Sequence, residues 1–280
     1  MSQPAAAALA PLPFELVYDD GVPVEDWLHA AHMQFVPALL YQLMKEQGRD
    51  DFFIGHNTFV YYSVEQAREV ADEVNNGKEE RAFRGPDLFW VGGVDGRRLR
   101  HAWISWEEDG RLPDVIIELL SPSTARKDRT EKKDLYARRF RTPEYFMYEA
   151  GKKLFEGLRL VDRTYEPIPP DKHGRFWSEQ LGAYLGLWHG IWRCMEADWI
   201  RLFRADGSMV PTEDELAIAA RRQAVAAQRQ AEEQRQRAEA ECQRAEEQRQ
   251  RAEAERQRAE AAEAELARLR ALLAERSQGS

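Results

Sequence analysis

PDVIIELLSPSTARKDRTEKKDLY, residues 113–136, is the stretch of sequence that decides the fold. Residues 115–120 within it form a branched, apolar run with proline close by on both sides, a pattern typical of a buried β-strand. Because the side chains of a strand alternate between its faces, Glu118 is expected among apolar neighbours. Burying an ionised carboxylate is costly, so Glu118 needs a charged partner, a bound metal or a raised pKa. The face predicted to carry it consists of Asp114, Ile116, Glu118 and Leu120.

A second acid and a lysine are expected to meet Glu118. The dipeptide Pro86-Asp87 introduces another apolar run, residues 88–91, which we predict to be a neighbouring strand. After the turn at 121–124, a predicted helix carries Lys132 on the same face as Asp128, Leu135 and Tyr136. Two acids and a lysine suit metal-assisted hydrolysis of phosphodiester bonds. The carboxylates hold a divalent cation, and the lysine offsets negative charge in the transition state.

The string PDVIIELLSPSTARKDRTEKKDLYARRFRTPEYF, residues 113–146, resembles the Uma-two family of restriction endonucleases, which are assigned to the PD-(D/E)XK nuclease superfamily. The resemblance covers roughly the first 205 residues, a usual domain size. It implies an α+β fold with a restriction-endonuclease-like mixed β-sheet core flanked by helices. It also implies that Asp87 and Glu118 bind Mg²⁺ or Mn²⁺ and that the protein cleaves DNA. The superfamily places its lysine two residues after the second acid, where this chain has Leu120, so the resemblance implies a lysine moved to the following helix, at Lys132.

Several alternatives remain open from the sequence. Lys133 adjoins Lys132 and is the alternative inward-facing lysine. Glu118 is alternatively a structural carboxylate that reaches water or one arginine at a strand edge. The whole domain is alternatively a nuclease-derived scaffold with weak or no activity that acts in protein association. His29 and His32 lie three residues apart on a predicted helix, where a structural role is favoured over a metal pair because no third ligand is evident.

Composition limits the other possibilities. The chain has 280 residues, a formal net charge of −9 and two cysteines, Cys194 and Cys242, in different segments. No apolar run is long enough to cross a membrane, and the cysteine pattern suggests neither a disulfide nor a metal site, which fits a cytoplasmic protein. Net acidity argues against a general electrostatic clamp on nucleic acid. Residues 125–141 are the only dense basic stretch outside the C-terminal segment, and either contact phosphates or form a solvated helix face.

Turn signals and periodicity divide the chain. A disordered tail is expected at 1–12, a nuclease domain at 13–205 and a linker at 206–212. Trp103 and Trp106 either cover core or stack on bases. The predicted elements are helices at 25–46 and 64–75, strands at 52–63 and 144–149, a β-meander over 86–120, a hairpin-like pair at 153–160 and 164–167, a turn and helix over 175–185, and β or loop structure over 186–204.

The segment 213–277 has a different composition, rich in Ala, Glu, Gln and Arg. EEQRQRAEAECQRA, residues 232–245, recurs as EEQRQRAEAERQRA, residues 246–259, and alanine or leucine returns every seven residues from 231 to 273. This is a heptad, but the facing positions are mostly polar. We therefore predict a long charged helix that forms a weak coiled coil between copies of the chain, with an isolated solvated helix as the alternative. The residues expected to associate are Leu266, Leu269, Leu272 and Leu273.

Overall fold

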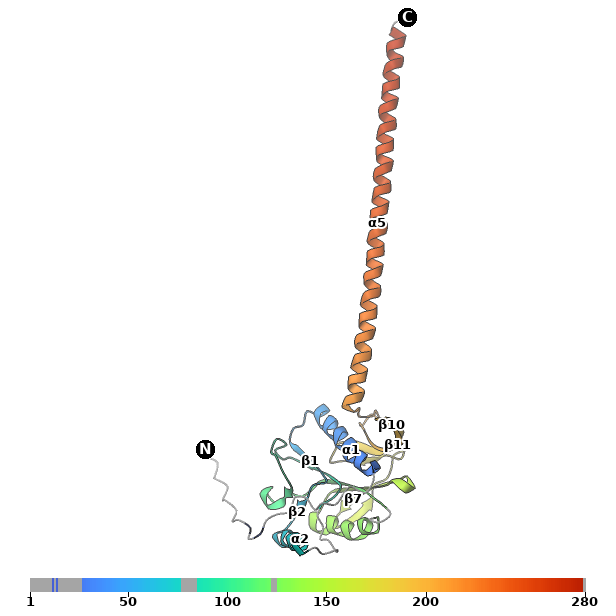
Figure 1. The fold of residues 1–280 in the computed structure, drawn as a ribbon. Coiled ribbons are helices and arrows are strands. Elements are labelled where there is room, and N and C mark those ends of the chain that lie inside the picture. Colours follow the sequence, from blue (N-terminus) through green and yellow to red (C-terminus); the bar gives the residue numbers. More distant parts are fainter. Residues whose placement is uncertain (1–11, 13, 15–26, 77–84, 122–124, 279–280) are drawn as a thin grey trace. The chain divides into compact units, whose positions relative to one another are not determined.

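The computed structural model of the chain describes residues 12, 14, 27–76, 85–121 and 125–278 (Figure 1). Almost all of the predicted disordered tail lies outside these residues. The chain divides into two compact units, Met1–Glu213 and Asp214–Ser280. The first contains a mixed six-stranded sheet with helices, and the second is helical. The predicted α+β class and the long C-terminal helix are therefore confirmed.

The central sheet of the first unit has the strand order β1-β3-β5-β6-β7-β8. β5 and β6 are parallel, and all other neighbours are antiparallel. Every residue of β3, β5 and β6 is buried, so both faces of the sheet centre have to be covered by other elements. The strands are β1 (Phe52–His56), β3 (Leu88–Gly92), β5 (Val115–Leu119), β6 (Glu144–Glu149), β7 (Leu154–Val161) and β8 (Thr164–Pro167).

The alternation predicted for the decisive stretch is confirmed in β5. Val115, Ile117 and Leu119 belong to the larger hydrophobic cluster of the protein, on one face of the sheet. Ile116 and Leu120 belong to a second cluster, on the other face. Glu118 alternates with these two residues, so the strand period places its carboxylate on the face of the second cluster.

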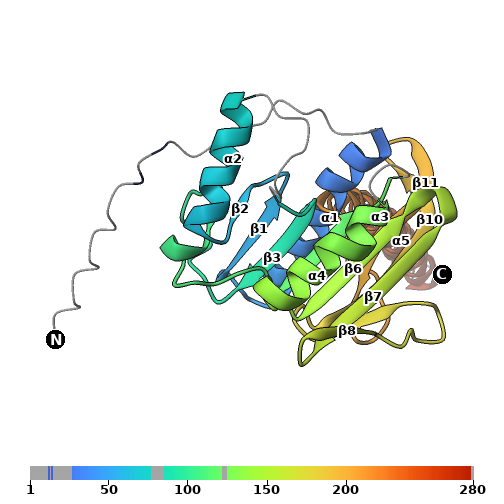
Figure 2. The same cartoon turned by 90° about the horizontal axis from the view of Figure 1, so that it is seen from below.

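Helices cover the two faces from opposite sides, as Figures 1 and 2 show. α1 (Trp27–Glu46) packs on the face of the larger cluster, where its buried Phe35 and Leu39 share a core with Trp199 and Leu202. The latter two come from a three-stranded sheet of β9 (Phe176–Ser178), β10 (Ala183–Trp192) and β11 (Met195–Phe203). Pro37 lies inside α1 without ending it. α1 is therefore held between two sheets.

The opposite face is covered by a helical segment that starts just after β5. It consists of α3 (Ala125–Lys127), the π-helical η2 (Asp128–Lys132), α4 (Lys133–Leu135) and the π-helical η3 (Tyr136–Phe140). One turn of a π-helix contains more residues than the 3.6 of an α-helix. Side chains four residues apart are therefore closer to the same face of this mixed helix than they would be on a regular α-helix. Single π-turns are frequent at functional sites. The segment ends at Arg141, which has the left-handed φ of 54°.

Three predicted elements differ in the structure. The strand expected over 52–63 is split into β1 and β2 (Val60–Tyr61), because Asn57 has a positive φ of 47° that breaks the extended backbone. The meander over 86–120 is wrong, since β3 pairs directly with β5 and the intervening β4 (Trp103–Ile104) pairs in parallel with β2. The helix expected over 175–185 is also wrong. Aromatic residues there extend as β9, and a turn at Gly182, with φ of 62°, leads into β10.

Other elements follow the predictions. α2 (Val64–Asn76) occupies the predicted helix at 64–75, and β6, β7 and β8 occupy the predicted strand and hairpin. Trp103 is fully buried, and its indole N–H donates to the carbonyl of Arg111 at 2.8 Å. Trp103 therefore covers core, and base stacking by this residue is excluded. Trp106 is half-buried with its ring beside Tyr61.

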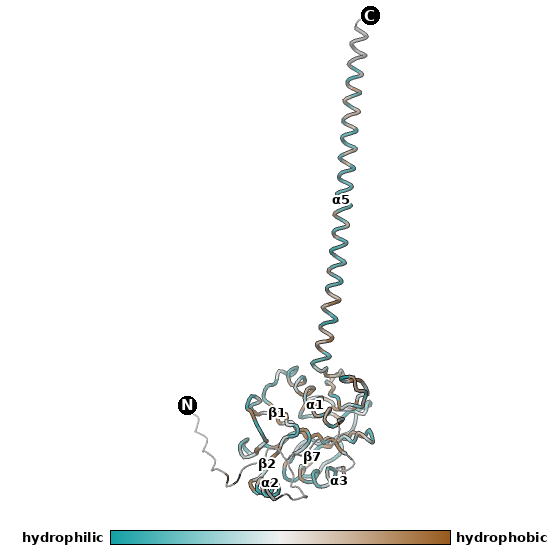
Figure 3. The backbone as a smooth tube through the Cα atoms, viewed as in Figure 1, coloured by the Kyte–Doolittle hydropathy of each residue, from teal (hydrophilic) through white to brown (hydrophobic). Residues whose placement is uncertain are grey.

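The second unit is the single helix α5 (Glu213–Gln278). Its 66 residues correspond to about 100 Å at about 1.5 Å per residue. Figure 3 shows it as largely hydrophilic, and ion pairs such as Arg235–Glu239 at 3.1 Å lie along it. Leu266 is exposed, and the side chains of the other three leucines expected to associate lie outside the described residues.

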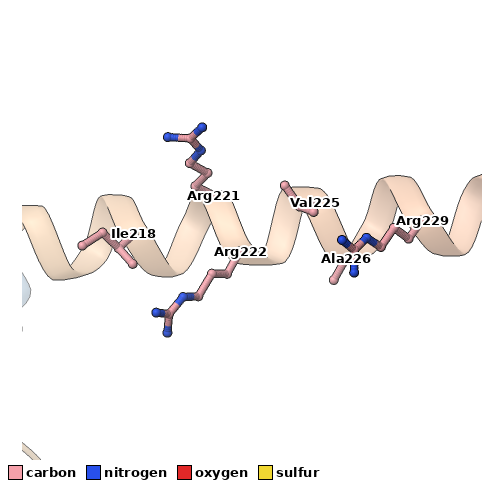
Figure 4. A pocket seen from close by; sticks show the side chains of 6 residues that line it. All are labelled: Ile218, Arg221, Arg222, Val225, Ala226 and Arg229. Carbon is pink, nitrogen blue, oxygen red and sulfur yellow. The ribbon is translucent and has the colours of Figure 1, made fainter.

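The start of α5 also carries exposed apolar residues. Ile218 and Val225 lie seven residues apart, with Arg221, Arg222 and Arg229 around them (Figure 4). All of these side chains come from one helix, so they form an open surface and not an enclosed site. Among the helices in the described ranges, none has the length and apolar character that a membrane span requires.

Candidate active site

The two predicted acids lie at neighbouring positions of the sheet: Asp87 immediately precedes β3, and Glu118 lies in β5, the antiparallel partner of β3. β3 and β5 pair with Leu88 opposite Ile117, a register that continues to Asp87 opposite Glu118. The backbone N–H of Asp87 points to Glu118 Oε2 at 3.4 Å. In return, Asp87 Oδ2 accepts a 2.7 Å hydrogen bond from the backbone N–H of Leu119. The sheet itself therefore fixes the separation of the two carboxylates.

Lys132 extends from the helical segment to Glu118. Its Nζ lies 3.1 Å from Glu118 Oε2 and 2.7 Å from Asp128 Oδ1. Within the described ranges, no carboxylate forms an ion pair with Lys133. The structure thus brings together the three predicted site residues, Asp87, Glu118 and Lys132, and of the two neighbouring lysines it places Lys132 on the acids.

Two members of the cluster were not predicted as site residues. Tyr136 is fully buried and donates its hydroxyl to Glu118 Oε1 at 2.5 Å. Asp128 is almost fully buried and forms an ion pair with Lys132 at 2.7 Å. The sequence feature that could identify Asp128 and Tyr136 is their spacing, since each lies four residues from Lys132. This spacing puts the three side chains on one face of the helix.

Burial and mutual repulsion control the protonation of this cluster. Burial raises the pKa of the Glu118 carboxyl well above its usual range, and the charges of Asp87 and Asp128 add to that rise. Burial opposes the charge of Lys132, but the surrounding carboxylates raise its pKa above the ordinary value. Burial would also raise the pKa of Asp87, yet His29 and Lys132 outweigh it and lower that pKa. The lysine therefore stays cationic, while Glu118 holds a proton more readily than a free glutamate does.

The two histidines of α1 have different surroundings. His32 is buried, with Nδ1 2.9 Å from the carbonyl of Leu28 and Nε2 accepting from the backbone N–H of Ile200 at 3.3 Å. It is the satisfied structural histidine that the sequence favours. His29 Nε2 instead lies 3.5 Å from Asp87 Oδ1. The first turn of α1 thus reaches the end of the sheet where the acids lie.

The donor set suits a divalent cation. The carboxylates of Glu118 and Asp128 contact the Lys132 ammonium, and the Asp87 carboxylate also contributes to raising the pKa of that lysine. Carboxylate oxygens are ligands that Mg²⁺ and Mn²⁺ prefer. In the part of the chain that the structure describes, no three His, Cys, Asp or Glu side chains are arranged to hold a metal as they stand. Glu118 is bonded to Lys132 and Tyr136, so it has to exchange one of these bonds for an ion.

The basic stretch after β5 has a mixed role. Arg129 is bound to Glu156 at 2.5 Å and to Glu149 at 3.2 Å, so it joins the helical segment to β6 and β7. Arg126, Arg138 and Arg139 are exposed. Part of the stretch is therefore structural, and part presents positive charge to solvent on the helical segment that carries Lys132.

Comparison with known proteins gives one match. The family model described as "Uma2: Putative restriction endonuclease" matches residues 13–193, more than half of the chain. No curated protein matches the chain. The matched region includes Asp87, Glu118 and Lys132.

Proposed function

Since this chain belongs to the Uma2 family, whose description names restriction endonucleases, we propose that it is a metal-dependent endonuclease that hydrolyses phosphodiester bonds of DNA. One observation carries the proposal: the Lys132 ammonium lies 3.1 Å from the Glu118 carboxylate, and the Asp87 carboxylate is bonded to the backbone N–H of Leu119, the residue next to Glu118. The family alone supplies the substrate class.

Each side chain has a role that follows from its contacts. Asp87 and Glu118 would hold the divalent ion, which when bound polarises the phosphate and lowers the pKa of a water molecule. Lys132 keeps its positive charge and so offsets the negative charge that develops on the phosphate. Asp128 fixes the ammonium at 2.7 Å, and Tyr136 orients the Glu118 carboxylate. Lys132 cannot act as the general base, because its pKa is raised by its acidic neighbours.

The exposed arginines of the helical segment that carries Lys132 support a polyanionic substrate. Arg126 and Arg138 belong to the same helical segment as Lys132 and are open to solvent. Phosphate contacts of this kind position nucleic acid without reading its sequence. Because the net charge of the chain is −9, such a local basic patch has to supply the attraction.

A plasmid cleavage assay with Mg²⁺ or Mn²⁺ tests the proposal. The wild-type protein is compared with Asp87→Asn and Glu118→Gln, and with Glu131→Gln as a control, since Glu131 is an exposed acid on the same helical segment. We expect metal-dependent cleavage by the wild type and the control, and its loss in both site variants. Cleavage that survives in the site variants would refute the assignment of the acids. A wild type that binds neither metal ion would instead favour a scaffold that acts through α5.

A further inference from the structure

We propose that His29 is a third protein ligand of the divalent ion, so that an imidazole nitrogen joins the carboxylates of Asp87 and Glu118. This inference rests on the proposed function, since it concerns the same metal site. It begins with the contact between α1 and the end of β3, where His29 Nε2 lies 3.5 Å from Asp87 Oδ1.

The distance between these two atoms fits a shared ion. Ligand atoms lie about 2.1 Å from Mg²⁺ or from a first-row transition metal, so two adjacent ligands of one ion are separated by about 3 Å and two opposite ones by about 4.2 Å. A separation of 3.5 Å falls between these limits. It is also longer than an ordinary hydrogen bond between nitrogen and a carboxylate. A small movement of either side chain would bring both atoms into one coordination sphere.

The remaining contacts show which side of the cluster is open. Asp87 Oδ2 is used by the backbone N–H of Leu119, which leaves Oδ1 as the oxygen that faces His29. Both oxygens of Glu118 are engaged, one by Tyr136 and the other by Lys132. An ion bound between Asp87 and Glu118 would therefore have the Lys132 ammonium next to Glu118 and the His29 imidazole next to Asp87.

His29 is reached from a pocket of about 200 Å³, which it lines together with residues at the ends of β5 and β6. Asp87, Glu118 and Lys132 are not among the lining residues of this pocket. The His29 side chain is 14% exposed and that of Asp87 is 24% exposed, whereas Glu118 is fully buried. The imidazole and the Asp87 carboxylate thus stand at the mouth of the cluster, and Glu118 forms its floor.

A nitrogen ligand would change which metals the site accepts. Imidazole favours transition-metal ions, whereas Mg²⁺ prefers an all-oxygen set. The His29 proposal therefore predicts that the wild type binds Mn²⁺ more tightly than Mg²⁺. The ratio of these two affinities is expected to be smaller in His29→Gln. Loss of the ligand is expected to weaken Mn²⁺ binding on the order of tenfold or more, by comparison with changes around other metal sites.

Pulsed electron paramagnetic resonance of Mn²⁺ bound to the full-length protein tests this directly, because a bound imidazole nitrogen modulates the electron spin echo. We expect ¹⁴N modulation in the wild type, its replacement by a ¹⁵N signal when histidine is ¹⁵N-labelled, and its loss in His29→Gln. The labelled wild type needs no substitution, so an absence of histidine modulation in it would overturn the proposal even if the variant fails to fold. His189→Gln is the control, because His189 lies beside Asp198 and Glu196 on the exposed surface of β10 and β11.

The outcomes separate the two proposals. Mn²⁺ that binds the wild type without histidine modulation, or with modulation that persists in His29→Gln, would overturn the role of His29 and leave the carboxylate site intact. Modulation lost in His189→Gln would assign the nitrogen to the surface histidine and would also overturn it. Mn²⁺ binding that is unchanged in Asp87→Asn and Glu118→Gln would overturn the metal site of the proposed function itself.

Discussion

Replacing Lys132 by methionine removes the ammonium that pairs with Glu118 and Asp128 while keeping most of the apolar stem. The Lys132 side chain is 18% exposed and bridges Glu118 at 3.1 Å and Asp128 at 2.7 Å. Removing one partner of a buried ion pair typically costs about 3–5 kcal/mol, because the other charge stays buried without compensation. Partial exposure and proton uptake by Glu118 reduce this cost, so we expect about 3 kcal/mol near pH 8 in metal-free protein.

The loss of unfolding free energy caused by Lys132→Met is expected to be larger at high pH than at low pH. The pKa of Glu118 in the folded protein lies well above the reference value of 4.5, and loss of Lys132 raises it further. The folded variant then binds a proton that the unfolded chain releases, so its stability falls as the pH rises above about 4.5. The destabilisation should therefore be smaller near pH 5 than near pH 8. The difference approaches about 1.4 kcal/mol for each unit by which the substitution raises the pKa of Glu118.

Urea denaturation followed by circular dichroism, in the presence of a chelator, measures these free energies of unfolding. Lys133→Met is the matched control, since it changes the adjacent, half-buried lysine, which has no ion pair among the described residues. We expect the control to stay within about 0.5 kcal/mol of the wild type. Equal costs for the two substitutions, or a cost for Lys132→Met below about 1 kcal/mol that does not vary with pH, would refute the reasoning.

The remaining predictions concern single contacts and the second unit. Tyr136→Phe removes the buried hydrogen bond to Glu118 and should lower the free energy of unfolding by about 1–2 kcal/mol, measured in urea. Gly55→Ala places a Cβ 2.1 Å from the Phe89 ring and should cost about 1–3 kcal/mol, which a thermal melt would detect. Titration calorimetry should show Mn²⁺ binding more weakly near pH 5 than near pH 8, because the raised pKa of Glu118 makes protons compete with the ion. Deleting residues 213–280 should reduce the number of chains per particle, obtained from the mass measured by light scattering; an unchanged number of chains would refute association through α5.

The parts of the fold that could be predicted are those in which local pattern and tertiary environment agree. The branched run of β5 is buried on both faces, and its two-residue period assigns Ile116 and Ile117 to different cores. The predictions are wrong where pairing with a strand distant in sequence, and not the local pattern of residues, determines the secondary structure. Nothing in the sequence near Trp103 indicates a parallel partner in β2, and the aromatic residues at 176–178 pair with β10 in place of forming a helix.

The candidate site was predictable to the extent that it depends on strand register and helix spacing. Asp87 and Glu118 meet because β3 and β5 are neighbours, and Lys132 reaches them because the helical segment follows β5 directly. His29 could not be placed in this way. His29 precedes Asp87 by more than fifty residues in the chain, and only the packing of α1 between two sheets brings it to the acids.

Anomalous diffraction from crystals soaked in Mn²⁺ tests the metal site most directly. The convergence of Asp87, Glu118 and Lys132 predicts an anomalous peak within about 2.1–2.3 Å of carboxylate oxygens of both Asp87 and Glu118. It also predicts that Glu118 has left one of its two bonds to Lys132 and Tyr136. A fully soaked crystal whose manganese lies elsewhere, with the bonds of Glu118 to Lys132 and Tyr136 unchanged, would contradict the metal-dependent nuclease.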